Sequence, residues 1–218
     1  MSDDANPGQS IPASESDDGS ASAATAHYGD HFLLRRKFLK IFGQSFHVYD
    51  TNDQVCFFAK LKAFKLKEDI RIYADTDQQN ELLRIQARSV IDFGATYDII
   101  DSAQDLKLGA LRRKGLKSIL RDSWLILDVN DEEIGTLTEG GGLIPALLRR
   151  LGGFGTLLMP QTFDAEVNGQ PVASFRQRRN PLIAMLDLDF SMDSQQVLDR
   201  RMGIAAALLM GAIEGRQN

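Results

Sequence analysis

A strand-like segment returns along this chain and leaves few folds open to it. Its copies at 46–50, 70–73, 97–101 and 124–128 start about 24 to 27 residues apart. Polar turn residues follow, and a second extended run stands at 55–58, 106–108 and 134–137. A fifth copy, 163–175, turns at Asn168–Gly169, which is the strongest short hairpin signal. Units repeated at this period normally stack to bury a shared face, so the sequence predicts a series of β-hairpins.

Two details refine these hairpins. Asp50, Asp101 and Asp128 close their strands, and each is expected to fix its turn by accepting hydrogen bonds from backbone N–H groups. Lys60 and Lys62 have the opposite parity to Lys65 and Lys67, which predicts a bulge or bend near Ala63–Phe64. Curved sheets and barrels need such bends.

The segment 202–213 is apolar on every face, which is typical of a helix inside a protein or a membrane. Twelve helical residues rise about 18 Å, whereas a hydrocarbon layer is about 30 Å thick. The small residues among them let strands approach the helix closely. We therefore expect a core helix inside a β-barrel, with a membrane-inserting tail as the alternative. The core positions are Met202, Ile204, Leu208, Leu209 and Ile213.

Residues 1–30 contain six acidic residues and no Lys or Arg, and they are poor in apolar side chains. Such a segment is predicted to be a disordered acidic tail before a single domain at 31–218. Without the tail, 24 acidic residues stand against 25 Lys and Arg, so the domain is close to neutral. The lone Cys56, the absence of a secretory pattern and the absence of a long apolar run favour the cytosol.

Hairpins that open with an aromatic residue and close with Asp, followed by a terminal apolar helix, resemble the LURP-one-related family. Its relatives are the phospholipid scramblases and the tubby C-terminal domain. The resemblance spans residues 31–215, and its closest local match is Leu186-Asp187-Leu188-Asp189 leading into Met202-Gly203-Ile204-Ala205. It implies a mostly β (α+β) fold: a closed antiparallel barrel of about twelve strands, built from repeated hairpins, that encloses a C-terminal hydrophobic α-helix.

The chain also departs from the scramblase pattern. Scramblases place calcium-associated carboxylates where this chain has Arg176 and Arg178, and a cation cannot ligate calcium. The acylated cysteine cluster is absent as well, since Cys56 stands alone. The LURP-one-related branch is therefore the better match, and calcium-dependent lipid scrambling is not expected.

No residue pattern predicts catalysis, a cofactor or a metal site. His27, His31 and His47 lack a nucleophile motif, and His47 is expected to face solvent on the opposite side from Phe46 and Val48. The glycine-rich segments 140–142 and 152–155 lack the Lys-Ser/Thr pair of a phosphate-binding loop and are interpreted as hinges. Asp187 and Asp189 share a strand face, either as a carboxylate pair or as ordinary solvated residues.

Clusters of cations are the better candidates for a binding site. Local positive patches in a near-neutral domain attract phosphate head groups, although ordinary solvated surface is the better interpretation of any single cluster. Tubby domains bind phosphoinositides through a basic surface, so the resemblance favours a lipid ligand. The candidate lipid- or anion-binding residues are Arg35, Arg36, Lys37, Arg112, Arg113, Lys114, Arg149, Arg150, Arg176, Arg178 and Arg179.

The insertion at 143–159 combines Arg149 and Arg150 with apolar residues between glycines. This composition suits docking at a membrane interface or in a partner's groove, and the alternative is a crossover packed on the barrel.

Two functions remain open at this point. The first is a non-enzymatic, monomeric, cytosolic barrel that binds anionic membrane lipid, peripherally at the inner membrane face. The second is a protein-interaction or structural module without a lipid ligand, which uses the acidic tail and the insertion as contact surfaces. Nucleic acid is not an expected partner, because no basic stripe with interleaved aromatic residues occurs.

Overall fold

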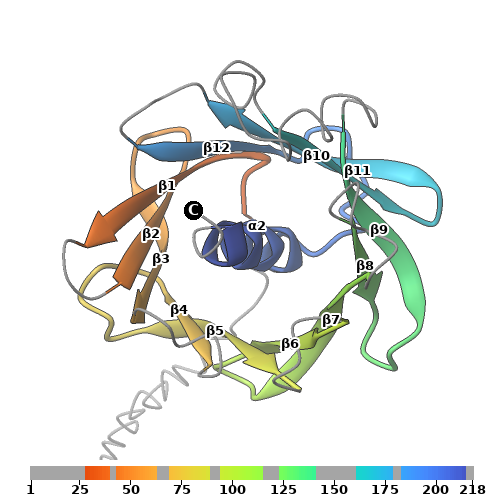
Figure 1. Cartoon of the computed structure of the whole chain (residues 1–218), viewed down its shortest axis with the longest axis horizontal. Coiled ribbons are helices and arrows are strands. Elements are labelled where there is room, and N and C mark those ends of the chain that lie inside the picture. The colour runs from red at the N-terminus through yellow and green to blue at the C-terminus, as the bar shows by residue number, and fades with distance from the viewer. Residues whose placement is uncertain are drawn as a thin grey trace, which may run out of the picture.

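Twelve antiparallel strands close on themselves around one helix in the computed structural model (Figure 1). The structure describes residues 28–39, 43–62, 69–88, 94–114, 123–140, 161–178 and 183–214. The strands are β1 (His31–Leu39), β2 (Gly43–Tyr49), β3 (Val55–Lys62), β4 (Ile70–Tyr73), β5 (Glu81–Ala87), β6 (Thr96–Asp101), β7 (Leu106–Arg113), β8 (Ser123–Leu127), β9 (Glu133–Glu139), β10 (Thr162–Val167), β11 (Gln170–Arg178) and β12 (Ala184–Asp189). The helix is α2 (Arg200–Glu214). The predicted fold class is therefore confirmed.

Each strand pairs with its neighbours in the sequence, and β1 closes the barrel by pairing with both β2 and β12. The hairpins predicted around 46–58, 97–108, 124–137 and 163–175 are all present. The sequence did not single out β1 or β5 as strands. The predicted bend at Ala63–Phe64 lies outside the described residues.

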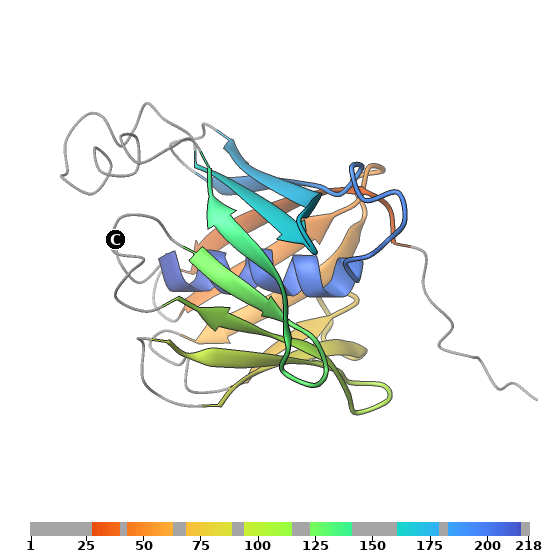
Figure 2. The ribbon, with the colours of Figure 1, turned by 90° about the vertical axis from the view of Figure 1, so that its right-hand side faces the viewer.

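The turns between β2 and β3, β4 and β5, β6 and β7, β8 and β9, and β10 and β11 lie at one end of the barrel, where α2 also begins, and we call this the turn end (Figure 2). The odd-numbered strands and α2 finish at the opposite end, the loop end. Asp50 accepts hydrogen bonds from the N–H groups of Asn52 and Gln54, and Asp128 does the same for Asn130 and Glu132. Asp101 likewise accepts from two amides of its turn, so the predicted role of these three residues is confirmed.

Five hairpins share a further detail: the strand register shifts near the turn end. The shifts fall at Val48/Tyr49, Ile72/Tyr73, Ile99/Ile100, Ile126/Leu127 and Ala165/Glu166. A bulge increases the local twist of a strand pair. Repetition of the same bulge around the sheet supplies the curvature that closure requires.

Helix α2 is the core of the barrel. Met202, Ile204, Leu208 and Leu209 are buried and Ile213 is partly buried against the same cluster, so the predicted core positions are confirmed. Gly203 lies so close to the ring of Phe190 that a Cβ atom there would overlap it. Among the described residues, no helix combines the length and the hydropathy needed to cross a membrane.

A buried ion pair holds the start of α2. The guanidinium of Arg200 donates to the Asp193 carboxylate at 2.8 Å, and both side chains are at most 5% exposed. Arg200 also donates to Asp30 at 2.8 Å, and the Tyr28 ring packs 5.2 Å from that of Phe57. Tyr28 and Asp30, which the sequence assigned to the tail, therefore belong to the barrel.

A second charged network lies on the outside and joins β5, β6 and β7 to the turn after β8. Arg88 donates to Asp98 at 2.6 Å and to Asp131 at 3.1 Å, and Lys107 donates to Asp131 at 2.6 Å. Hydrogen bonds from Arg88 and then Lys107 hold the pKa of Asp131 well below its ordinary value.

A pH dependence follows from this carboxylate. Because folding lowers its pKa, Asp131 stabilises the fold above the unfolded-state pKa of about 4, and this contribution is lost as the pH falls through the lower folded-state value. Asp131→Asn is thus expected to lower the melting temperature at pH 7 by a few degrees, and the difference should shrink below pH 4. Thermal unfolding followed by circular dichroism at several pH values measures this. The control is Asp77→Asn, because Asp77 forms no ion pair within the described residues. A difference that persists unchanged at pH 2.5 would contradict the assignment.

Candidate functional site

Cations gather on the outer surface of five adjacent strands, β3, β2, β1, β12 and β11. Register places Arg35, Met185 and Arg178 in one row across β1, β12 and β11. A second row joins Lys37, Ser45 and Lys60 across β1, β2 and β3. Arg176 lies opposite Asp187. We call the set Arg35, Lys37, Lys60, Arg176 and Arg178 the basic face.

Much of this positive charge is not neutralised. Lys37, Lys60 and Arg176 are exposed and form no ion pair within the described part of the chain. Arg178 pairs with Asp187 at 2.7 Å, and Arg35 lies 3.9 Å from Asp53. The basic face therefore carries more cations than carboxylates and is accessible to an anion.

Aromatic side chains lie between these cations. The guanidinium of Arg35 stacks 4.5 Å above the Tyr49 ring, and the His47 ring lies 4.9 Å from that of Phe58. His47 is on the opposite strand face from Phe46 and Val48, as predicted, but it is half-buried. Burial, and secondarily the charge of Lys37, lower the pKa of His47. His47 is thus neutral at pH 7 and adds no charge to the basic face.

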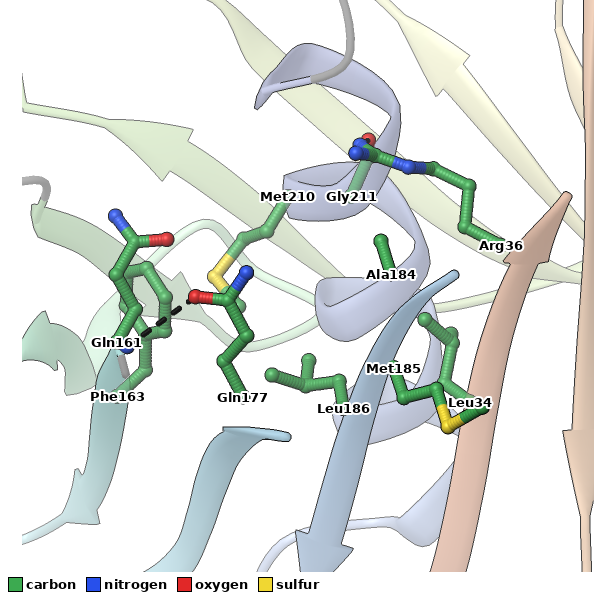
Figure 3. Close-up of a pocket in the computed structure, with 10 residues that line it drawn as sticks. All are labelled: Leu34, Arg36, Gln161, Phe163, Gln177, Ala184, Met185, Leu186, Met210 and Gly211. Atoms are coloured by element: carbon green, nitrogen blue, oxygen red, sulfur yellow. Dashed lines mark hydrogen bonds between the residues drawn. The ribbon is translucent and has the colours of Figure 1, made fainter. Parts of the chain in front are cut away.

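A pocket opens at the loop end, on the inner side of the same strands (Figure 3). Its cavity is small, about 40 Å³, and opens to solvent. Its apolar lining comes from β1, β10, β12 and the last turns of α2, and its polar lining from Arg36, Gln161 and Gln177. Gln161 donates its backbone N–H to Oε1 of Gln177 at 3.3 Å. We call it the mouth pocket, and its mixed lining suits a small part of an amphiphile.

Arg36 and its two neighbours do not act as one cluster. Successive strand residues face opposite sides, so Arg35 and Lys37 point outward while Arg36 points into the barrel. Its guanidinium donates to the Gly211 carbonyl oxygen at 2.7 Å, in the last turn of α2 (Figure 3). A cation at this position complements the negative end of the helix. Arg36 thus joins the helix end to the mouth pocket.

The second predicted cluster lies elsewhere. Arg112 and Arg113 end β7, Lys114 follows, and β8, β9 and β10 separate them from β11. Arg112 donates to Oγ1 of Thr96 at 3.1 Å. These cations share the loop end with the mouth pocket but belong to another side of the barrel. Arg149, Arg150, Arg179 and the insertion 143–159 lie outside the described residues.

Sequence reasoning missed Lys60 and Tyr49 as members of this surface. The alternation of Phe58 and Lys60 along β3 already indicated that both share a strand face. Their proximity to β1 depends on the pairing of β2 with both strands, which no local pattern encodes.

The remaining candidate residues have structural roles within the described part of the chain. Asp187 and Asp189 are both partly exposed and bind different partners, Arg178 and His31. No group of three or more His, Cys, Asp or Glu is arranged to hold a metal within the described ranges. Burial raises the pKa of Cys56 to about 12, and its thiol donates to the Val48 carbonyl oxygen, so the thiol stays protonated.

The two ends of the barrel differ in charge. The connections at the turn end, residues 28–30, 50–54, 74–80, 102–105, 128–132, 168–169 and 190–199, contain no Lys or Arg. They carry Asp30, Asp50, Asp53, Asp75, Asp77, Asp105, Asp128, Asp131, Glu132, Asp193 and Asp199. Six of these carboxylates form ion pairs: Asp30, Asp53, Asp105, Asp131, Asp193 and Asp199. The other five form none within the described residues, so they leave the turn end negative while the basic face is positive.

Comparison with known proteins adds no assignment, since no family model, curated protein or solved structure matches this chain.

Proposed function

We propose that the protein is a non-enzymatic barrel that binds anionic phospholipid at a membrane surface through the basic face. The observation that carries this proposal is that Lys37, Lys60 and Arg176 share one outer surface, on strands β1, β3 and β11 of the same run of five, without carboxylate partners in the described residues. Cations near an anionic membrane contribute about 1 kcal/mol each. The acidic turn end is repelled by the same surface, so the charge separation orients the barrel.

The mouth pocket supports an amphiphile more than a free anion. It lies under β1, which carries Arg35 and Lys37 of the basic face, and under β12. Met185 of β12 lines the pocket and stands in register with Arg35. A phosphate can be held by the cations while a short apolar part of the same lipid enters the pocket. The proposal includes the resemblance to the LURP-one-related barrels and a peripheral location at the inner face of the membrane.

Sedimentation with liposomes tests this function. The variant Lys37→Gln/Lys60→Gln/Arg176→Gln should bind vesicles that contain phosphatidylserine about 100-fold more weakly than the native chain, from three cations at about 1 kcal/mol each. Binding of the native chain should weaken as salt rises, because salt screens exposed charges.

The matched control removes three cations outside the basic face, as Arg71→Gln/Arg84→Gln/Lys107→Gln. These cations are all held in ion pairs with nearby carboxylates. The control should retain most of the binding. Equal binding to neutral and anionic vesicles, or an equal loss in the control, would overturn the proposal.

A further inference from the structure

A wide groove lies at the turn end, away from the mouth pocket. The connection between β12 and α2 forms one wall, and β5, β6 and β7 with their turns form the other. The groove encloses about 1710 Å³ of space that is open to solvent. Its apolar lining includes Tyr28, Leu82, Leu106 and Val197. Its charged lining consists of three carboxylates and three cations: Glu81, Asp101, Asp199, Lys107, Arg200 and Arg201.

Exposed apolar side chains concentrate at the same end. In the described residues, the exposed large hydrophobic side chains are Leu106, Val129, Met192 and Val197, and each follows or precedes a turn-end connection or lies within one. Leu106 is 56% exposed and Val197 is 49% exposed, and these two line the groove from opposite walls. Apolar side chains that flank a cleft mark a surface that is completed by a partner.

Charge selects the kind of partner. The charges that line the groove balance, because three cations stand beside three carboxylates and Arg201 pairs with both Asp101 and Asp199. The excess charge around the groove is negative and comes from the neighbouring turns. Within the described residues, Asp75, Asp77, Asp128 and Glu132 of these turns form no ion pair. The connections around the groove contain only acidic charges. The chain's own segment 1–27 is acidic and has no Lys or Arg, so its charge does not complement this end. An anionic lipid or a nucleic acid is disfavoured for the same reason.

We propose that the groove binds a basic, amphipathic peptide segment of a partner protein. The apolar side chains of the segment pack between Leu106 and Val197, and its cations face the surrounding carboxylates. Such a segment matches both the exposed apolar side chains of the groove and the negative charge around it, whereas a neutral apolar peptide matches only the apolar side chains. This interaction is independent of lipid binding, because the groove and the basic face are separate surfaces.

The test uses the full chain and a fluorescein-labelled peptide of alternating Lys and Leu, about twelve residues long, with fluorescence anisotropy as the readout. Leu106→Ser/Val197→Ser is expected to weaken peptide binding at least tenfold. The matched control is Val129→Ser/Met192→Ser, because Val129 is 54% and Met192 is 42% exposed at the same end but neither lines the groove. The control should bind within twofold of the native chain.

Two further peptides and two further measurements distinguish the other possible occupants. A peptide of alternating Lys and Ser should bind at least tenfold more weakly, and one of alternating Glu and Leu should not bind. Equal binding of the Glu peptide, or equal losses in both serine variants, would overturn the proposal. Sedimentation velocity tests whether a second copy of the chain occupies the groove. Self-association that Leu106→Ser/Val197→Ser abolishes would also overturn the proposal. Liposome binding should be unchanged in Leu106→Ser/Val197→Ser. The peptide proposal and the lipid proposal can therefore be refuted independently of each other.

Discussion

Replacing Asp193 with alanine is expected to lower the free energy of unfolding by about 3–5 kcal/mol, the usual cost of removing one partner of a buried ion pair. The Arg200 guanidinium, which is only 5% exposed, would stay buried but lose its buried counter-ion. The backbone N–H groups of Val197 and Leu198, which donate to the same carboxylate at 2.8 and 3.0 Å, would also lose their acceptor. Chemical denaturation followed by Trp124 fluorescence measures the change.

Asp30→Ala is the matched control, because Asp30 binds the same guanidinium at 2.8 Å but is 48% exposed. An exposed partner contributes about 1 kcal/mol or less. Asp193→Ala/Arg200→Met should recover part of the loss, since no unpaired buried charge remains. A loss below 1 kcal/mol in Asp193→Ala would show that the pair does not anchor the start of α2.

Phe190→Ala is the second large effect, with an expected loss of about 3–5 kcal/mol, typical of emptying a fully buried aromatic site. The ring is 0% exposed, lies 5.8 Å from that of Phe175 and 6.1 Å from that of Phe32, and covers Gly203. Phe190→Ala should also reverse the sign of the stability change caused by Gly203→Ala. In the native chain Gly203→Ala destabilises, because its Cβ would lie 2.6 Å from Cζ of Phe190 and closer still to Cε1.

In the Phe190→Ala background the same substitution should stabilise by about 1 kcal/mol, since alanine favours a helix over glycine and the overlap is gone. A double-mutant cycle by urea denaturation measures this coupling. Gly211→Ala serves as the control, because its Cβ would meet Phe46 at 3.0 Å and has no contact with Phe190. Additive effects for Phe190→Ala with Gly203→Ala would contradict the proposed contact.

Most of the architecture could be predicted because its signals are local. The Asp-containing turns, the Asn168–Gly169 hairpin and the apolar run 202–213 of α2 each reveal their structure within a few residues. Strand β1 was missed because Arg36 interrupts its alternation with an inward cation. The partner that stabilises this cation is the Gly211 carbonyl oxygen, 175 positions away in the sequence. A contact of that kind is invisible to periodicity.

The candidate site was predictable only in part. Arg35, Lys37, Arg176 and Arg178 were chosen as members of separate clusters, and closure of β1 on β12 brings them together. The same reasoning grouped Arg36 with its neighbours, although strand geometry sends it to the other side. Sequence clusters report the number of charges, whereas strand register decides which of them share a surface.

The order of elements also has a consequence for synthesis. The core of this barrel, α2, follows all twelve strands in the chain, so a ribosome makes the entire wall before the part that fills it. Until β12 has been made, β1 has no second neighbour and the nascent sheet has two open edges; until α2 has been made, its apolar concave side stays uncovered. Both are sites for aggregation. Incomplete chains of this protein are therefore expected to depend on chaperones until α2 has been made.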